Sequence, residues 1–554
     1  MKHLVRVLLV FNFSFFTFHF SFAQYTHADT LRGTNGSGRD WWDVTRYDVN
    51  VKFNLADSTI SGENRIVYKI LKEGKKIQID LQEPLIIDSI FFSIPQSRRR
   101  VTNIVKDGNA YFLTIPGITD TYNKLQGYRV LTVYYHGKPI IAVKPPWDGG
   151  LIWKRDKKNN PWISVACQGL GASVWYPCKD YQGDEPDNGA SFTTTLNDSL
   201  SVISNGKLKS KISREGITTT TWEVKNPINN YNLSFYIGKY VHFNEIYKGL
   251  KGNVNMDYWV LDHNLEKAKI HFADAKKMIK AFEYWFGPYP FYEDGYKLVE
   301  APHLGMEHQS GIAYGNGYLK GYHGSDLSGS GWGMKWDFII VHESGHEWFG
   351  NNITTKDIAD MWVHESFTNY SETLFTEYYY GKEAANAYVQ GLRKNIENKN
   401  PIIADYGVNK ESETTDMYYK GANMIHAIRQ IINNDKKFRE ILTGLNQIFY
   451  HKTVTTKQIE NYISAQAKIN FSKVFDQYLR NTEIPVLEYK LNGHTLQYRW
   501  TNCVKGFDMP LKINFKGSRW IKPTEAWKTL SVYPEGDINF AVDQNFYINT
   551  KKVD

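Results

Sequence analysis

Cysteine is scarce in this chain, and its scarcity limits the kinds of fold that are available. Three Cys among 554 residues are too few for a disulfide framework, which excludes the small disulfide-stapled secreted domains. Cys167 and Cys178 lie close enough in sequence to form one bridge in an oxidising compartment, and two buried thiols are an equally good interpretation. Cys503 is left over in both cases. A chain of this length therefore needs several hydrophobic cores to hold it together.

Apolar runs long enough to cross a bilayer, about 20 residues, are missing beyond the N-terminus. At the N-terminus, Lys2 and Arg6 precede an almost wholly apolar stretch, and Ser21 and Ala23 are small residues at the positions that signal peptidase reads. The sequence therefore predicts a signal peptide over residues 1–23 and a mature chain exported to the periplasm or the medium, with no stable membrane span. An uncleaved anchor is the competing interpretation, but the apolar stretch is short and interrupted by polar residues.

A strong excess of one charge is also missing. The 66 Lys and Arg residues against 58 Asp and Glu give a net charge of +8, and two of the basic residues lie in the predicted signal peptide. No run of basic residues resembles a nucleic-acid footprint, so we expect no nucleic-acid partner. Internal repeats and long low-complexity tracts are absent as well, which indicates ordinary globular domains.

What the sequence does contain is a metal-ligand pattern. His342-Glu343-Ser344-Gly345-His346 places two histidines four positions apart, so on a helix their imidazoles share one face and reach a single metal ion. Glu343 projects toward the same cavity, where it can take a proton from a metal-activated water. Glu365 follows nineteen residues after His346 and supplies the third ligand that a catalytic zinc site needs.

The surroundings of this pattern favour a buried site over the alternative, a helix that carries two core or solvated histidines by chance. An apolar run leads straight into the first histidine, as expected of a buried helix. Glu365 stands among aromatic residues, and a buried carboxylate is costly unless it is paired or binds a metal. Glu347 and Asp360 are candidates to orient the ligand imidazoles from outside the ligand set.

Together these residues resemble the aminopeptidase N family of zinc metallopeptidases, the gluzincins that also include the leukotriene hydrolases. That family has HExxH, eighteen intervening residues and then a Glu in a Trp-Leu-Asn-Glu-Gly-Phe context. The spacing to Glu365 matches in full, whereas His364 and Ser366 replace the usual Asn and Gly. The resemblance implies one zinc ion bound by the two histidines and Glu365, with Glu343 as the general base.

A second segment extends the resemblance toward substrate binding. Gly305-Met306-Glu307-His308 resembles the family's Gly-Ala-Met-Glu-Asn signature, with His308 where Asn is usual. The resemblance implies that Gly305 and Met306 lie on an exposed edge strand that pairs with a peptide substrate. It also implies that Glu307 binds the free α-ammonium group of that substrate. The plainer alternative is a solvated Glu in a loop.

Two single residues complete the implied site. Tyr418-Tyr419-Lys420-Gly421-Ala422 resembles the family's Tyr-x-Lys-Gly-Ala element, so Tyr418 matches the Tyr whose hydroxyl stabilises the oxyanion. Gln168, nine residues before a Pro-Cys-x-Asp element, matches the Gln that lines the pocket for the first substrate residue. An amide offers both a donor and an acceptor there, although a turn Gln bonded to backbone is an alternative.

The resemblance therefore implies an exported zinc aminopeptidase that acts in peptide catabolism on peptides with a free N-terminus. Two rival functions stay open. A thermolysin-type zinc endopeptidase would share the zinc ligands but has no need of Glu307. A non-catalytic exported peptide-binding protein of the same fold would typically have lost a ligand or the base, whereas every such position is filled here. Neither the preferred N-terminal residue nor the oligomeric state is predicted.

The pattern along the chain predicts a multidomain α+β fold. Alternating apolar residues such as Tyr47, Val49 and Val51 predict strands in a β-rich, saddle-like N-terminal domain over residues 38–240. Helical spacing from residue 264 onward indicates a thermolysin-like, mostly helical zinc domain over residues 241–480. A hairpin signal at Asn492-Gly493 predicts a small C-terminal β-sandwich over residues 484–554.

The sequence does not decide two features around the substrate cavity. Many relatives carry a large helical domain after the β-sandwich, and none is expected here, so the outer wall of the cavity is either open or closed by a partner subunit. The Gly/Ser-rich stretch 315–333, with seven glycines, precedes the zinc helix. We interpret it as a solvated connector, with a mobile flap over the site as the alternative.

Overall fold

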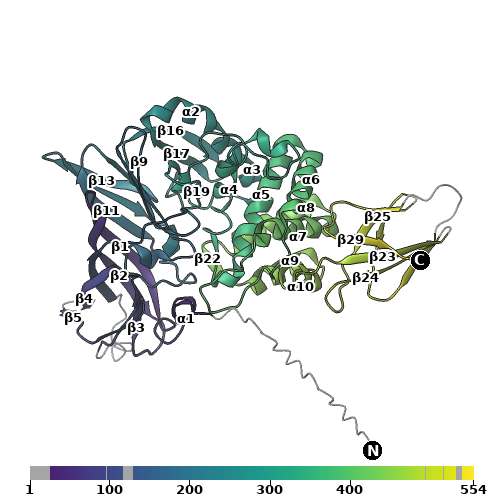
Figure 1. The fold of residues 1–554 in the computed structure, drawn as a ribbon, viewed down its shortest axis with the longest axis horizontal. Helices are drawn as coiled ribbons and strands as arrows, with labels where there is room; N and C mark the ends of the chain where they lie inside the picture. Colours follow the sequence, from purple (N-terminus) through teal and green to yellow (C-terminus); the bar gives the residue numbers. More distant parts are fainter. Residues whose placement is uncertain (1–24, 95–96, 116–128, 493–494, 516, 532–539) are drawn as a thin grey trace, which may run out of the picture.

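The computed structural model describes residues 25–94, 97–115, 129–492, 495–515, 517–531 and 540–554 (Figure 1). The predicted signal peptide, residues 1–23, lies outside these ranges. Strands dominate the two ends of the molecule and helices lie between them, which confirms the expected multidomain α+β fold. Among the described residues, we find no helix with the length and apolar content that a membrane crossing requires.

The N-terminal region consists of three β-sheets. The largest has the strand order β13 (Lys207–Arg214), β14 (Ile217–Val224), β11 (Ala190–Asn197), β1 (Trp42–Asn54), β2 (Thr59–Ile70), β8 (Arg129–Gly137), β4 (Ile86–Ile94) and β5 (Ser97–Arg100). The second has the order β12 (Ser201–Ser204), β15 (Phe235–Gly238), β10 (Pro161–Ala166) and β9 (Gly150–Arg155). The third has the order β3 (Ile77–Asp80), β7 (Ala110–Leu113) and β6 (Ile104–Asp107).

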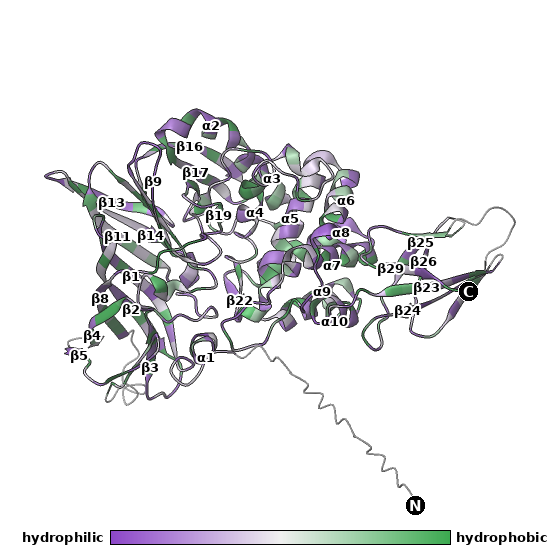
Figure 2. Ribbon diagram, viewed as in Figure 1, coloured by the Kyte–Doolittle hydropathy of each residue, from purple (hydrophilic) through white to green (hydrophobic). Residues whose placement is uncertain are grey.

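Strand β1 shows why the sequence folds this way. Tyr47, Val49 and Val51 are buried, and the polar residues between them are more exposed, so the predicted period-two strand is confirmed. β1 pairs in parallel with β11 and antiparallel with β2. Figure 2 shows hydrophobic and hydrophilic residues mixed along the strands of this sheet, and its apolar face packs into a core that it shares with later parts of the chain, for example Val299 and Met306.

The middle of the chain combines a sheet with a group of helices. The sheet has the order β16 (Tyr240–Gly249), β17 (Gly252–Leu261), β18 (Tyr296–Glu300), β20 (Ile312–Tyr314) and β19 (Gly305–Met306), which leaves β19 at its edge. The helices are α2 (Leu265–His271), α3 (Ala273–Phe286), α4 (Phe338–Gly345), α5 (Trp362–Tyr380), α6 (Lys382–Gly391), α7 (Asp416–Ile432), α8 (Asp435–Ile448), α9 (Thr456–Ala467) and α10 (Ser472–Leu479). Two short strands, β21 (Ile353–Thr355) and β22 (Lys452–Val454), pair in parallel.

The C-terminal region returns to strands in two small sheets. One has the order β27 (Lys528–Ser531), β24 (Thr495–Thr501), β23 (Val486–Asn492) and β29 (Asn549–Lys552), and the other β26 (Ser518–Ile521), β25 (Leu511–Phe515) and β28 (Phe540–Val542). Leu487 lies opposite Trp500, and Leu491 opposite Leu496, which is the pairing that the hairpin signal predicts. The sheets project beyond the helices at one end of the molecule (Figure 1), yet their apolar residues join the helical core.

Three smaller features bear on the substrate cavity. The N-terminal helix α1 (His27–Gly33) lies between the N-terminal sheets and the helical region (Figure 1). All three cysteines are free thiols, with Cys167 and Cys178 buried. The Gly/Ser-rich stretch 315–333 is folded into turns. The Asn316 side chain holds these turns by donating to the Leu319 and Gly321 carbonyls at 2.8 and 2.9 Å.

Candidate active site

Helix α4 carries the two histidines of the predicted metal site. The Asp337 carboxylate caps its N-terminus by accepting from the backbone N–H groups of Ile339 and Ile340 at 3.1 and 3.3 Å. All residues of α4 are buried, so the helix fits the apolar run that precedes the first histidine. His342 lies within α4, and His346 lies one turn later, at its C-terminal cap. The two imidazole centroids are 5.1 Å apart.

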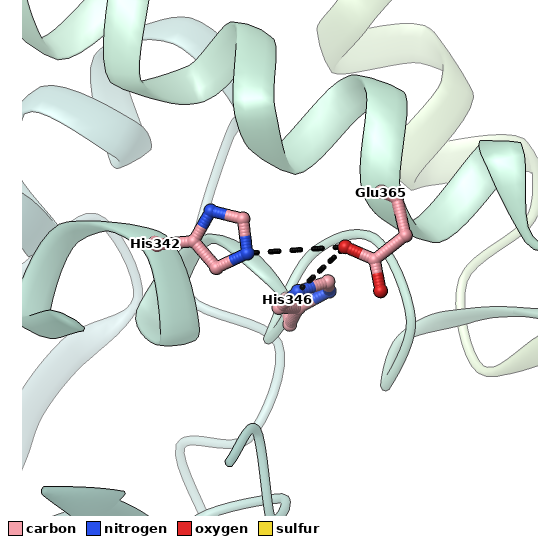
Figure 3. Close-up of side chains that lie close together, drawn as sticks. All are labelled: His342, His346 and Glu365. Carbon is pink, nitrogen blue, oxygen red and sulfur yellow. Dashed lines mark ion pairs between the residues drawn. The ribbon is translucent and has the colours of Figure 1, made fainter. Parts of the chain in front are cut away.

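Helix α5 brings the third side chain to the same point. Glu365 lies in its first turn, and its Oε2 atom is 3.8 Å from His342 Nε2 and 3.4 Å from His346 Nε2 (Figure 3). The three ligand atoms all lie within 4.8 Å of one another. The carboxylate thus faces both imidazoles in the arrangement that the sequence pattern predicts.

The outer nitrogens of both imidazoles are occupied. His342 Nδ1 is 2.7 Å from Glu372 Oε1, and His346 Nδ1 donates to the Phe349 carbonyl at 3.0 Å. These bonds fix the rings so that Nε2, the free nitrogen, points toward Glu365. Glu372 was not identified from the sequence, although it follows Glu365 by seven residues on the same helix. A spacing of seven is two helical turns, so it could have been found.

Two other carboxylates, predicted as candidates to orient the imidazoles, lie elsewhere. Glu347 accepts hydrogen bonds from the Ser310 backbone N–H at 2.8 Å and from the Tyr289 hydroxyl at 3.0 Å. Asp360 accepts from the Tyr406 hydroxyl at 2.7 Å. Neither candidate orients a ligand imidazole, because Glu372 and the Phe349 carbonyl occupy the two Nδ1 atoms.

The chemistry of the His342, His346 and Glu365 cluster fits a metal cation. Glu365 Oε2 is buried and accepts no hydrogen bond from the described residues, although both imidazole Nε2 atoms lie within 3.8 Å of it. A buried carboxylate oxygen in this state is costly unless a cation completes the site. Burial alone would lower the pKa of His346, but the carboxylates of Glu365, Glu307 and Glu343 raise it to about 10. The site therefore attracts positive charge, and two imidazole nitrogens with one carboxylate oxygen are the donors that zinc prefers.

Glu343 lies beside this cluster, against the edge strand. A Cβ atom on Gly305 would lie 2.6 Å from Glu343 Oε1, so only glycine allows the strand to approach the carboxylate this closely. Burial raises the pKa of the Glu343 carboxyl well above its usual range, and the nearby Glu307 raises it further. Glu307, Glu343 and His346 form a second group whose polar atoms lie within 4.8 Å of one another.

Glu307 is held by partners from the N-terminal region. The Gln168 amide donates to Glu307 Oε1 at 2.7 Å, and the Tyr231 hydroxyl donates to the same oxygen at 3.0 Å. Burial raises the pKa of Glu307. Tyr231 was not identified from the sequence, because nothing in its surroundings distinguishes it among 37 Tyr residues. The structure thus joins Gln168 and Glu307, which are 139 residues apart.

Tyr418 comes from α7, which packs on α5. Its ring centroid is 6.1 Å from that of His342. The packing between the helices is close, because a Cβ atom on Gly421 would lie 1.8 Å from Ser366 Oγ. The Ser366 hydroxyl donates to the Met417 carbonyl at 2.6 Å. The departure at Ser366 from the expected Gly therefore adds a bond between the helix that carries Glu365 and the helix that carries Tyr418.

One cavity of about 910 Å³ joins all these groups. Its lining includes every residue that the sequence predicts for the site: Gln168, Gly305, Met306, Glu307, His342, Glu343, His346, Glu365 and Tyr418. His308 replaces the usual Asn, is buried, and lies 2.7 Å (Nδ1) from the Tyr236 hydroxyl. The arrangement can bind a cation and place a carboxylate base and a phenol donor beside it.

Comparisons with known proteins point in the same direction. Residues 271–478 match the peptidase family M1 domain, and residues 44–231 match the peptidase M1 N-terminal domain. The chain is 23% identical over 448 residues to probable aminopeptidase 2 of Sulfurisphaera tokodaii, covering 76% of this chain and 53% of that protein. It is also 23% identical to leukotriene A-4 hydrolase of Xenopus laevis, covering 59% and 54%. The chain thus spans about half the length of these relatives.

The fold is similar to solved structures as well. A mutant M1 zinc metallopeptidase from Deinococcus radiodurans, bound to a Tyr-Ser-Ala substrate, superposes with a TM-score of 0.66. The alignment covers 80% of this chain and 95% of that one, at 18% sequence identity. At this identity the likeness concerns the fold, which places β-rich and helical regions in the same order.

Proposed function

Because this chain belongs to the peptidase M1 family, we propose that it is a zinc-dependent aminopeptidase that removes the N-terminal residue from peptides. The observation that carries the proposal is the position of Glu307. Its carboxylate lies within 4.8 Å of Glu343 and His346 polar atoms, beside the metal-ligand cluster. A buried carboxylate at this distance is suited to an α-ammonium group whose neighbouring peptide bond reaches the metal site.

One zinc ion would be held by His342, His346 and Glu365. When bound, zinc polarises a carbonyl oxygen and makes water a stronger nucleophile at neutral pH. Glu372 and the Phe349 carbonyl would hold the two imidazoles in their ligand orientation, since they occupy the Nδ1 atoms. Glu365 Oε2, which accepts no hydrogen bond from the described residues, would be neutralised by the ion.

Glu343 would act as the general base and later as the general acid. Its carboxylate is buried and lies against Gly305, so it is next to the strand on which the substrate backbone would lie. It accepts a proton from the attacking water and then donates it to the departing amine.

Tyr418 would stabilise the negative charge that develops on the carbonyl oxygen. Burial raises the pKa of its hydroxyl well above the usual range, so the phenol stays protonated and can donate. A donor that is already in place costs no reorganisation in the transition state. The packing of α7 on α5 through Gly421 and Ser366 fixes this donor relative to Glu365.

Glu307 and Gln168 would bind the substrate's free N-terminus. The ammonium group pairs with the Glu307 carboxylate, and the Gln168 amide orients that carboxylate through its 2.7 Å bond. Gly305 and Met306 of the edge strand β19 would pair with the substrate backbone. An acetylated N-terminus has no charge to offer Glu307, so this site favours exopeptidase activity over endopeptidase activity.

Export is the remaining part of the proposal. The predicted signal peptide, residues 1–23, would direct the chain to the periplasm or the medium. The mature chain would then begin at Gln24, shortly before helix α1. Mass spectrometry of the protein from its native cells, compared between cell fractions, tests this directly.

The activity is tested with a panel of aminoacyl-chromophore amides and their N-acetylated counterparts. We expect cleavage of the free substrates only, loss of activity with a chelator, and recovery with added zinc. Glu307→Ala should severely weaken cleavage of the free substrates. Glu413→Ala is the matched control, because Glu413 lines the same cavity but is exposed and pairs with Lys410 at 3.0 Å. Equal cleavage of acetylated substrates, indifferent to Glu307, would instead establish an endopeptidase.

A further inference from the structure

We propose that Arg32, in the N-terminal helix α1, is a positioning residue for the α-ammonium subsite. In this proposal Arg32 holds the turn that follows Gln168, so that the Gln168 amide stays on Glu307. The inference rests on the proposed aminopeptidase function, since it concerns how that site binds its substrate. It assigns a role in substrate binding to a segment that lies before the first strand of the N-terminal sheets.

The turn after Gln168 contains two glycines in a left-handed backbone region. Gly169 and Gly171 have φ angles of +72° and +101°, a backbone region that only glycine adopts readily. The turn is closed by a bond from the Gly171 N–H to the Cys167 carbonyl at 2.6 Å. Groups from outside the turn add to this bond, among them the Gln82 amide, which donates to the Leu170 carbonyl at 2.7 Å.

Arg32 supplies the outside contacts. Its Nη1 atom donates to the Gly169 carbonyl at 2.7 Å, and its Nε atom lies 3.1 Å from Asp180 Oδ2. A Cβ atom on Gly171 would lie 2.3 Å from Arg32 Cζ, so the guanidinium packs directly against the turn. A planar guanidinium can reach the carbonyl and the carboxylate at once, which a single ammonium group does not match.

The Gly169 carbonyl also accepts a hydrogen bond from the loop that precedes α7. Asn409 Nδ2 donates to the Gly169 carbonyl at 2.9 Å, and the Asn409 N–H donates to the Asp29 carbonyl of α1 at 3.0 Å. The Tyr25 hydroxyl donates to Asp405 Oδ2 at 2.6 Å. Helix α1, the Gly169 turn and the loop before α7 therefore meet at one backbone oxygen, next to Gln168.

Arg32 does not line the substrate cavity, whereas Gln168 and Asn409 do. Its effect on the substrate must therefore pass through the turn. If Arg32 is lost, the Gly169 carbonyl keeps only the Asn409 bond. The Gln168 amide is then free to leave Glu307, and the Glu307 carboxylate loses a bond that points it at the ammonium group.

The experiment compares Arg32→Met, Arg32→Lys and Asn409→Ala in the zinc-loaded, full mature chain. The first readout is the KM and kcat for a free aminoacyl amide. The second is the affinity for an unblocked dipeptide, measured by calorimetry in a Glu343→Ala background so that no turnover occurs. The control is Arg46→Met, because Arg46 also donates to a backbone carbonyl, that of Asn188 at 2.9 Å, and pairs with a carboxylate, but it does not line the cavity.

We expect Arg32→Met to raise KM and to weaken dipeptide binding by roughly tenfold, the loss expected when one hydrogen bond to a charged group fails. The value of kcat should stay within about twofold of wild type, because the zinc ligands and Glu343 are untouched. Arg32→Lys and Asn409→Ala should give intermediate losses, since each keeps other anchors of the turn, among them the Gln82 amide that donates to the Leu170 carbonyl at 2.7 Å. Arg46→Met should change neither quantity.

Unchanged KM and dipeptide affinity in Arg32→Met, with or without a lower unfolding temperature, would overturn the inference and leave Arg32 a purely structural role. If Arg32→Met does not fold, unchanged binding in both Arg32→Lys and Asn409→Ala would overturn it in the same way. A wild-type enzyme that cleaves acetylated substrates equally well would instead refute the proposed function, and the inference with it. The wild-type enzyme therefore tests the proposed function, and the Arg32 and Asn409 variants test the inference.

Discussion

At the scale of single residues, the site depends on bonds that orient its ligands. The two ligand histidines use their outer nitrogens for fixed partners, so both Nε2 atoms face Glu365 before any metal arrives. Such preorganisation strengthens metal binding, because less side-chain freedom is lost when the ion enters. Glu372 is the clearest example of a side chain that orients a ligand. It is buried and accepts hydrogen bonds from His342, Asn369 and Tyr388.

We expect Glu372→Gln to weaken zinc binding by about 10–100-fold, the usual effect of removing an outer-sphere carboxylate. The measurement is the zinc dissociation constant from competition with a chelator. The matched control is Glu377→Gln, which lies on the same helix and pairs with Arg429 at 2.6 Å, away from the ligands. An affinity equal to that of wild type in Glu372→Gln would show that His342 needs no orienting partner.

A second residue prediction concerns the phenol donor. Tyr418→Phe should lower kcat by about 10²–10³, the effect of removing one oxyanion donor, and leave KM nearly unchanged. The adjacent Tyr419→Phe is the control, since Tyr419 also lines the cavity but occupies the variable position of the motif. Steady-state kinetics on a free aminoacyl amide measure both. Equal losses in the two variants would assign the donor role to neither hydroxyl in particular.

Residues whose spacing the chemistry dictates could be predicted from the sequence. The spacing of His342 and His346 on one helix and the carboxylate at Glu365 predict a shared metal site, whereas Glu307, Gln168 and Tyr418 were expected only because their motifs resemble those of a family. The partners of these residues were harder to find. Tyr231 and Arg32 act through contacts with segments far away in the chain, and no local pattern records such a contact.

At the scale of elements, the packing of α7 on α5 sets the distance between the phenol donor and the metal ligands. Gly421 allows the approach, and Ser366 fills the remaining space and bonds to the Met417 carbonyl. The Lys-Gly-Ala element of the motif thus has a packing explanation. Its glycine is required because a larger residue would push one helix away from the other.

We expect Gly421→Ala to destabilise the fold by about 1–3 kcal/mol through overpacking and to lower kcat, because Tyr418 and Glu365 move apart. Thermal unfolding and kinetics measure the two effects. The double variant Ser366→Gly with Gly421→Ala should recover part of both losses, since it removes the hydroxyl that the new methyl group meets. Purely additive losses in a double-mutant cycle would contradict this explanation.

Elements with a strong periodic pattern were predicted well, but the points at which they begin, break and end were predicted less well. Strand β1 and the β23–β24 pairing follow from alternation, because one face of each is buried. The helical pattern from residue 264 is continuous in the sequence, but the structure divides it at Phe272 into α2 and α3. The buried Phe272 ring packs between Tyr258 and Tyr314, and a sequence pattern does not show which neighbours an apolar residue will meet.

At the scale of the whole molecule, the C-terminal sheets are part of the helical core. Asn545 accepts a hydrogen bond from Gln390 at 2.8 Å and lies 3.0 Å from His426 Nε2, and the Tyr478 hydroxyl donates to the Tyr547 carbonyl at 2.6 Å. Apolar residues of both regions belong to one continuous cluster. The sheets therefore support α6, α7 and α10, although they project from the molecule in Figure 1.

Ending the chain after residue 483 should consequently lower the unfolding temperature or cause aggregation, because α10 and α7 would expose apolar surface. A milder variant, Asn545→Ala, should cost about 1–3 kcal/mol by leaving buried polar groups unpaired. Thermal scanning measures the effect of the truncation, and denaturant unfolding measures the effect of Asn545→Ala. A truncated chain with wild-type stability and activity would show that the sheets are an independent appendage.

The edge position of β19 has a consequence for which peptides survive. A substrate that lies along Gly305 and Met306 as an added strand must offer its own backbone N–H groups to the pairing. Proline has no N–H and a fixed φ angle, so a peptide with proline in its second position cannot complete the strand. We expect such peptides to resist cleavage whatever their first residue, as a digest followed by mass spectrometry would reveal. Peptides protected in this way would be left for an enzyme of another specificity.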